Sequence, residues 1–349
     1  MTDKKISELT AATDLTGAVF LAAQGGSSKQ VPASVLQSFL GLALGPQGRL
    51  SLSSAVAVSE ADVVGATSIY YVPSVGRWVP VYNGADYILA SIGAQLTLPL
   101  DSNSGHTGYH QSGKIFDLFA VNDAGTVRLV TGPAWSSDTS RGAGAGTTEL
   151  EVNDGLLLNK VTIVARYGSG SGDTLSVAAG RATYLGSFRA VANGQATDSA
   201  ANRLLFNAYN QTGRSLLVYE ATASWNYSTN TWRQANNSLS NQVSVLAGLA
   251  GMMVNLSGMV YAFNSTASAR QVSMAIGVDS TTVPAALSLI GSAGVVALFA
   301  SFGCSYSGYP GLGYHTLTWL ERGVGTDTQT WAGTSGTNVR SGLTGSVLN

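Results

Sequence analysis

Short apolar segments separated by tight turns recur along most of this chain. Residues 96–100 place an apolar side chain at every second position, which is the period of a half-buried β-strand. The pair Asn83-Gly84 and the triplet Asn153-Asp154-Gly155 stand between such segments. They favour hairpin turns, because these residue types tolerate positive φ. Turns spaced about ten residues apart are typical of antiparallel sandwiches and barrels. The pattern predicts an all-β fold.

The composition is that of a charge-poor β-rich protein rather than a typical cytosolic enzyme. Charged residues make up 11% of the 349 residues, against roughly 25% in average domains. Gly occupies 42 of the 349 positions, which is well above the roughly 7% of average domains. With a net charge of −1 and no basic patch, we expect no nucleic acid as a partner. No apolar run approaches the ~20 residues that span a bilayer, and no signal-peptide core follows the charged N-terminus. We therefore expect the protein to be made in the cytoplasm and not to insert into a membrane.

The N-terminal residues 1–45 form a small segment of their own. Apolar residues 18–23 and the return stretch 29–31 flank Gly25-Gly26, which predicts a hairpin. Pro32 then occupies a first-turn position, and the apolar residues after it predict a short helix. About forty residues rarely fold alone, so we expect other chains to stabilise this segment; the alternative is an arm packed on its own domain. The residues expected to make the attachment are Ile6, Leu9, Leu15, Val31 and Leu36.

Beyond a Gly- and Pro-containing linker, the pattern predicts tandem antiparallel β-sandwich domains, jelly-roll-like, over residues 46–197 and 215–349. Residues 198–214 are expected to form a connecting helix. Asp198 is a suitable N-cap there, Leu204 and Leu205 have helical spacing, and Gly213 ends the element. The apolar run 295–300 is expected inside a sheet or against another chain. The aromatic residues within 181–236 are expected to pack at the joint between the domains.

The sequence contains no motif for catalysis or for a cofactor. His106 and His110 have a spacing that suits a metal on a helix, but the glycines around them favour exposed loop histidines instead. Glycoside hydrolysis requires two carboxylates that face one cleft, and no spacing pairs them here. We expect no enzymatic activity, no cofactor and no metal. The lone Cys304 is expected to be a small buried thiol.

Aromatic residues in charge-poor surroundings favour contact with a glycan, because an aromatic face stacks on a sugar ring while amides bind its hydroxyls. Tyr306, Tyr309 and Trp331 lie in Gly- and Ser-rich stretches and are the candidate receptor contacts. The alternative is that these three rings pack within the protein.

Several sequence strings resemble a family of virion proteins of tailed bacteriophages, the head and tail fibres. The resemblance covers most of the chain. The strings are YLGSFR at 184–189, DS at 198–199, FN at 206–207, YN at 209–210, WRQAN at 232–236, GVDS at 277–280, GYHTLTWLE at 313–321 and SGLTGS at 341–346. The stretch KISELTAATDLTGAVFLAAQGG at 5–26 is similar to the virion-attachment segment of many phage fibres.

The resemblance implies a non-enzymatic homotrimer located in the virion. Its N-terminus would bind a capsid or tail protein, and its C-terminal domain would contact the host surface, where a glycan is one possible receptor. Two alternatives remain open, a capsid decoration protein and a polysaccharide-degrading tailspike. The long β-helix repeats of most such tailspikes are absent from the sequence.

Overall fold

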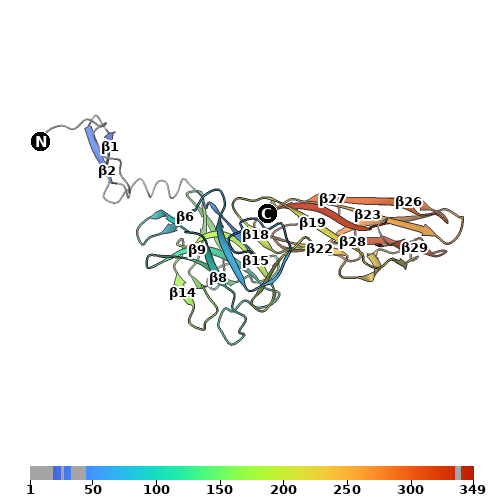
Figure 1. The fold of residues 1–349 in the computed structure, drawn as a ribbon, viewed down its shortest axis with the longest axis horizontal. Coiled ribbons are helices and arrows are strands. Elements are labelled where there is room, and N and C mark those ends of the chain that lie inside the picture. Colours follow the sequence, from blue (N-terminus) through green and yellow to red (C-terminus); the bar gives the residue numbers. More distant parts are fainter. Residues whose placement is uncertain (1–18, 25–26, 33–44, 335–338) are drawn as a thin grey trace.

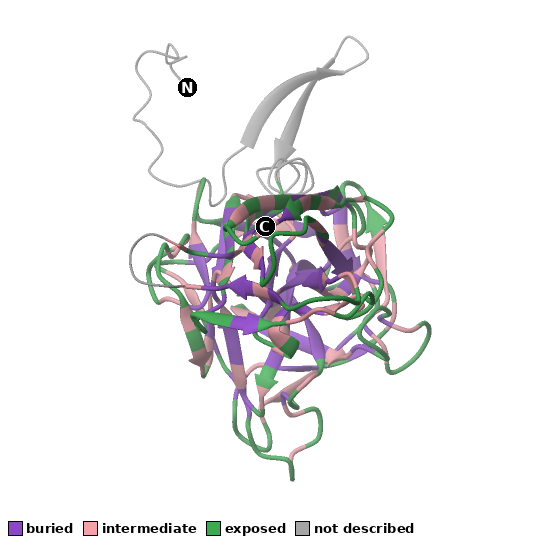
Figure 2. Cartoon of the chain, turned by 90° about the vertical axis from the view of Figure 1, so that its right-hand side faces the viewer, coloured by how far each residue is buried: buried purple, intermediate pink, exposed green. Residues whose placement is uncertain are grey.

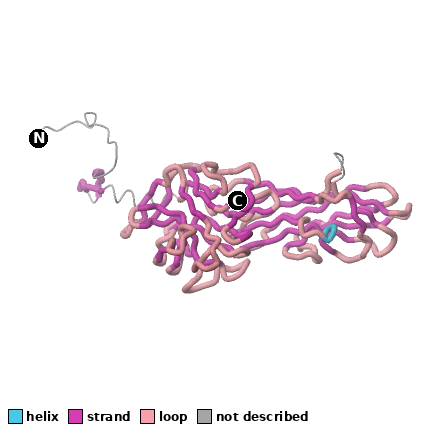
Figure 3. The backbone as a smooth tube through the Cα atoms, turned by 60° about the horizontal axis from the view of Figure 1, so that its bottom comes forward, coloured by secondary structure: helices cyan, strands magenta, loops and turns pink. Residues whose placement is uncertain are grey.

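The structure is a computed structural model that describes residues 19–24, 27–32, 45–334 and 339–349. Within these ranges the regular elements are β-strands, apart from the short 3-10 turn η2 (Ala235–Asn237). The strands form several mainly antiparallel sheets (Figure 3). The expected all-β, sandwich-type fold is confirmed. None of the described residues belongs to a helix long and apolar enough to cross a membrane.

The first two strands, β1 (Val19–Gln24) and β2 (Ser27–Pro32), form an antiparallel hairpin. Their register runs from Val19 opposite Pro32 to Gln24 opposite Ser27, which confirms the predicted strand, turn and return strand. Neither strand pairs with any other described strand (Figure 1). The short helix expected after Pro32 lies outside the described residues.

Two β-rich regions follow. The first region consists of β3 (Gly48–Ser51), β4 (Val63–Ala66), β5 (Ser68–Pro73), β6 (Trp78–Tyr82), β7 (Tyr87–Ser91), β8 (Leu96–Pro99), β9 (Ile115–Asp123), β10 (Thr126–Ala134), β11 (Leu150–Asn153), β12 (Leu156–Asn159), β13 (Ile163–Arg166), β14 (Thr174–Val177), β15 (Thr183–Ala192), β16 (Gln195–Asp198), β17 (Asn202–Arg203) and β18 (Leu205–Asn207).

The C-terminal region consists of β19 (Gly213–Tyr219), β20 (Ser224–Asn226), β21 (Arg233–Gln234), β22 (Gln242–Ala247), β23 (Val254–Asn264), β24 (Arg270–Val278), β25 (Ser288–Leu289), β26 (Gly291–Val295), β27 (Ala300–Gly308), β28 (Gly313–Arg322), β29 (Gln329–Ala332) and β30 (Gly342–Leu348). In Figure 1 the two regions lie end to end along the long axis of the molecule.

One long sheet runs through both regions. Its main path is β14-β13-β10-β9-β15-β16-β17-β22-β28-β24-β26. The step between the regions is the parallel pairing of β17 with β22, in which Asn202 lies opposite Ser244 and Arg203 opposite Val245. Residues within the predicted connecting segment therefore pair directly with a strand of the C-terminal region.

Each region buries its own apolar core. Seen along the long axis in Figure 2, buried residues fill the inside of the molecule and exposed residues lie on its outside. In the C-terminal region a seven-stranded sheet, which includes β19-β30-β23-β27-β25, packs against the β22-β28-β24 part of the long sheet. Val260, Met274 and Trp319 from the two layers meet in this core. In the first region the small sheet β3-β5-β8 covers β9 and β15, and Ile69 and Phe188 lie in the shared core. Facing sheets with apolar inner positions are the arrangement of a β-sandwich.

Buried polar contacts also join the two regions. The Arg49 guanidinium donates to the backbone oxygens of Asn210 and Asn349, at 2.8 and 2.7 Å. The backbone N–H of Asn207 donates to Asn349 Oδ1 at 2.8 Å. Asn349 therefore lies between the regions, where Figure 1 marks the C-terminal end of the chain. The aromatic residues predicted for this joint do not all lie there. Phe206 reaches across from β18 of the first region into the C-terminal core. Trp225 lies within the C-terminal region itself, where it packs edge-on against Trp319.

The expected helix within residues 198–214 is wrong. Asp198 ends β16 and pairs with Arg203 of β17 across a tight turn. β18 then pairs with β15, with Asn207 opposite Gly186. The leucines that suggested a helical stripe are consecutive buried residues of an extended chain, because neighbouring elements cover both of its sides. Sheet pairing with distant strands overrides the local spacing.

The apolar run 295–300 does not form a strand inside a sheet. Val295 ends β26 and is buried, but Leu298 and Phe299 are 74% and 57% exposed in the connection to β27. The Phe299 ring packs edge-on against Phe263, with centroids 4.7 Å apart. The other expectation for this run, contact with another chain, stays a prediction.

Candidate functional site

Two of the three predicted receptor contacts are buried, so that part of the prediction is wrong. Trp331 in β29 is 0% exposed, and its Nε1–H donates to the Tyr227 carbonyl oxygen at 2.9 Å. Tyr306 in β27 is 5% exposed. The Gly and Ser residues around Tyr306 belong to a strand, where small outward side chains alternate with buried ones. Tyr309, 62% exposed just after β27, is the remaining candidate contact in the C-terminal region.

Four of the five predicted attachment residues, Ile6, Leu9, Leu15 and Leu36, lie outside the described residues. Val31 lies in β2, opposite Phe20 of β1. The hairpin therefore places one of the predicted residues on a strand, and the attachment role stays a prediction.

His106 and His110 take part in hydrogen bonds and an ion pair that connect strands and loops of the first region. His110 is buried, contrary to the expectation of exposed loop histidines. Its Nδ1 accepts a hydrogen bond from the Asp101 backbone N–H at 2.8 Å, and its Nε2 lies 3.0 Å from Thr131 Oγ1. Burial, with Arg166 nearby, lowers the pKa of His110 to about 4, so the ring is neutral at pH 7. The Asp101 carboxylate pairs with His106 and Arg166, at 2.9 and 3.0 Å. Nowhere in the described ranges do three His, Cys, Asp or Glu side chains gather to hold a metal ion.

The most buried carboxylate in the C-terminal region, that of Glu321, belongs to a buried hydrogen-bond network. Glu321 is fully buried and accepts hydrogen bonds from Trp225 Nε1, Arg233 Nε and the Asn236 backbone N–H, at 2.7, 2.8 and 3.1 Å. Burial raises the pKa of Glu321 to about 7, although these donors act in the opposite direction. The Asn236 amide donates onward to Glu220 at 3.1 Å. Because both carboxylates are buried, we assign them to the stability of the fold.

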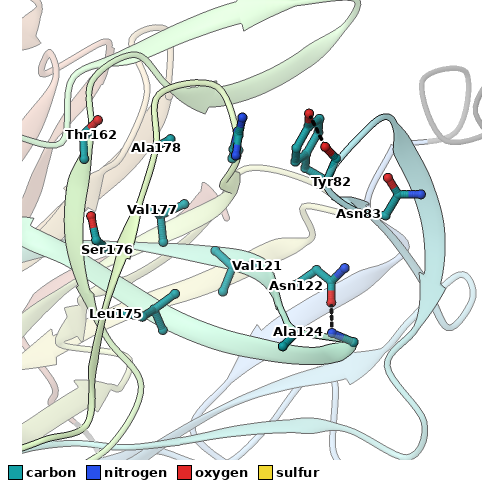
Figure 4. A pocket seen from close by; sticks show the side chains of 13 residues that line it. Tyr82, Asn83, Val121, Asn122, Ala124, Thr162, Leu175, Ser176, Val177 and Ala178 are labelled. Carbon is teal, nitrogen blue, oxygen red and sulfur yellow. Dashed lines mark hydrogen bonds between the residues drawn. The ribbon is translucent and has the colours of Figure 1, made fainter.

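An open cleft with a volume of about 580 Å³ lies in the first region (Figure 4). Four separate parts of the chain form it: the β6–β7 turn, the end of β9 with the β9–β10 turn, Thr162 just before β13, and β14 with the residues that follow it. Buried Val121 and Val177, with half-buried Leu175, supply an apolar floor.

An aromatic ring with an arginine on its face forms one wall of the cleft. The Arg181 guanidinium carbon lies 4.7 Å from the ring centroid of Tyr82, a distance typical of a cation–π contact. The Tyr82 hydroxyl donates to the Gly84 carbonyl oxygen at 2.9 Å, and the ring packs edge-on against Tyr87. These contacts fix the orientation of Tyr82 without a ligand.

Two turn asparagines line the cleft and carry hydrogen-bond donors (Figure 4). Asn83 Oδ1 accepts from the backbone N–H groups of Ala85 and Asp86, both at 2.9 Å. Asn122 Oδ1 accepts from the Gly125 N–H at 2.9 Å. The Oδ1 atom of each side-chain amide is therefore already hydrogen-bonded within its own turn. Within the described part of the chain, neither Nδ2 group has a hydrogen-bond partner.

The remaining polar lining consists of the exposed hydroxyl residues Thr162 and Ser176. Arg181 is the cation of the lining, which contains no carboxylate. Sequence reasoning identified Asn83 only as a turn residue and missed the cleft. Its walls come from turns about forty to sixty residues apart, which meet only through sheet pairing.

No family model matches the chain, and no curated protein matches it. Among solved structures, a tryptic-core variant of the Bacillus thuringiensis protein Cry1Da is similar at 8% sequence identity with a TM-score of 0.17. The similarity covers 78% of this chain and 49% of that protein, so this chain spans about half of its length. A similarity this weak identifies neither fold nor function.

Proposed function

We propose that this chain is a non-enzymatic fibre or spike protein of a tailed bacteriophage, located in the virion and attached to a capsid or tail protein by its N-terminal segment. The observation that carries the proposal is the β1–β2 hairpin, which pairs with none of the other described strands. A lone two-stranded hairpin is marginally stable in water, so a binding partner would supply the missing contacts. The resemblance of residues 5–26 to phage attachment segments gives the class of that partner.

Deletion of residues 2–44 tests the attachment. We expect the shortened protein to keep the melting temperature of the full chain, because the strands from β3 onward pair only among themselves. We also expect it to be lost from assembled particles. The measurement is the amount of each protein in virions purified from cells that supply the full or the shortened chain. Shortened protein present in virions at the full-chain level would contradict the proposal.

The second part of the proposal is that the chain forms a homotrimer through the outer face of the seven-stranded sheet. None of the exposed residues on β19, β23, β27 and β30 is charged. Leu217, Tyr219 and Met259 line a shallow groove of about 190 Å³ there. Arg340 is at its edge, with its guanidinium carbon 5.0 Å from the Tyr219 ring centroid. Leu217, Tyr219 and Met259 are exposed among Ser, Thr and Asn residues, on a sheet face whose outward positions are ordinarily polar.

A second copy of the chain is the occupant that fits this face best. The exposed strand positions of two such faces meet without like-charge repulsion, and the cation at the groove, Arg340, lies over the Tyr219 ring. Ser, Thr and Asn side chains such as Ser257, Thr344 and Asn255 offer both donors and acceptors. They can therefore pair with the same residue types on a copy.

A lysine in the middle of this face is expected to disrupt the trimer. Ser257 is exposed on β23 and lines the groove, so Ser257→Lys would bury an unpaired cation in the interface. We expect light scattering after size exclusion to give three chain masses for the wild type and one for this variant. The matched control is Ser169→Lys, at an exposed Ser in the β13–β14 connection of the first region. A monomeric wild type, or a Ser257→Lys trimer, would rule out this interface.

A further inference from the structure

We propose that the cleft of the first region binds a carboxylate-bearing saccharide. The site lies in a different region from the predicted contacts Tyr306, Tyr309 and Trp331. The inference rests on the lining of the cleft alone and does not depend on the proposed role in a virion.

The hydrogen-bonding groups of the cleft match a ligand rich in hydroxyl groups. The Nδ2 groups of Asn83 and Asn122 are donors without a partner in the described chain, and their amide planes are held by the turn hydrogen bonds at Oδ1. Thr162 and Ser176 add hydroxyls that both donate and accept. The two amides, fixed before the ligand arrives, bind at a low entropic cost.

The apolar surface of the cleft suits the carbon face of a sugar ring. Val121 and Val177 form the floor, and the half-buried ring of Tyr82 stands beside it. Ligand sites commonly combine such apolar surface with a few fixed polar groups. The cleft is open rather than enclosed (Figure 4), so a residue within a longer saccharide chain can enter.

Arg181 determines the charge of the ligand. Its guanidinium lies on the Tyr82 ring and forms no ion pair with a carboxylate of the described residues. The cleft lining contains no acidic side chain that would repel an anion. A carboxylate on the ligand can form a bidentate pair with a guanidinium. One cation does not make a basic patch, so this electrostatic pattern fits a single acidic group better than a polyanion such as nucleic acid.

Binding of the full chain to an immobilised oligosaccharide panel tests the proposal. The panel contains oligosaccharides with uronic or sialic acid residues and neutral oligosaccharides of the same length. We expect binding to acidic members and none to neutral ones. Arg181→Gln removes the ion pair and should weaken binding by about tenfold or more. Asn122→Asp keeps the acceptor for the Gly125 N–H, replaces the donor with a carboxylate and should weaken binding at least as much.

Asn193→Asp is the matched control. Asn193 Oδ1 accepts from the Ser112 backbone N–H at 2.9 Å, so the substitution makes the same chemical change in another turn, outside the cleft. We expect wild-type binding from this variant and unchanged melting temperatures for all three. Three results would overturn the proposal: no binding to any acidic member, equal binding to acidic and neutral members, or equal weakening by Asn193→Asp and the cleft variants.

Discussion

Asp117→Ala is expected to lower the free energy of unfolding by about 3–5 kcal/mol, the usual cost of leaving one member of a buried ion pair unpaired. Asp117 on β9 is fully buried and accepts two hydrogen bonds from Arg141, at 2.6 Å from Nε and 3.0 Å from Nη2. It also accepts from Trp135 Nε1 at 3.0 Å and from Ser187 Oγ at 2.7 Å. The substitution therefore removes the acceptor for three side chains at once.

Arg141 makes this loss larger, because its side chain is only 9% exposed. Its guanidinium lies 4.3 Å from the Trp135 ring centroid and donates to the Gly248 carbonyl oxygen, just after β22, at 2.6 Å. The network therefore links the first region to the C-terminal region. Urea denaturation followed by tryptophan fluorescence measures the change, and we expect Trp135, in contact with the ion pair, to report it.

A double variant separates the buried charge from simple loss of packing. Arg141→Met removes the cation and keeps much of the side-chain volume, so Asp117→Ala combined with Arg141→Met should be less destabilising than the sum of the two single changes. The matched exposed pair is Asp123 with Arg128, at 2.7 Å and about one-third exposed. Asp123→Ala should cost no more than about 1 kcal/mol. Additive effects at Asp117 and Arg141 would mean that the ion pair is not the source of the stability.

The local part of the fold could be predicted from sequence because hairpins depend on neighbouring residues. Asn83-Gly84 lies in the β6–β7 turn, where Tyr82 pairs with Tyr87. Asn153-Asp154-Gly155 marks the β11–β12 turn, where Asn153 pairs with Leu156, and Asp154 and Gly155 both have positive φ. In each case the turn residues permit the backbone geometry that brings the flanking strands into register.

The errors have a common origin in long-range pairing. Residues 198–209 have a helical spacing of leucines, yet their backbone pairs with β15, β4 and β22, which lie elsewhere in the sequence. Tyr306 and Trp331 have Gly and Ser neighbours typical of loops, but β27 and β29 both pair with β23, and the two rings face the core. Burial in a sandwich depends on which strand covers a position, and no local pattern contains that information.

Two buried titratable groups should give opposite pH dependence over the same interval. The pKa of Glu321 rises from 4.5 to about 7 in the folded protein, so between these values only the unfolded state is ionised and stability falls as pH rises. The pKa of His110 falls from 6.5 to about 4. Between those values only the unfolded state is protonated, and stability rises with pH. Both side chains are fully buried, so solvent does not screen either effect.

Single substitutions should reveal each contribution. Between pH 4.5 and 6.5, the reference pKa values of the two groups, each changes the free energy of unfolding by about 2 kcal/mol, in opposite directions. Glu321→Gln should therefore gain about 2 kcal/mol more than the wild type as pH rises over this interval, and His110→Asn should lose about as much relative to it. Urea denaturation at several pH values measures these differences, in which contributions of all other groups cancel. If the free energy of unfolding of Glu321→Gln changes with pH as that of the wild type does, Glu321 is ionised in the folded protein. Its three hydrogen-bond donors then outweigh the cost of burying its charge.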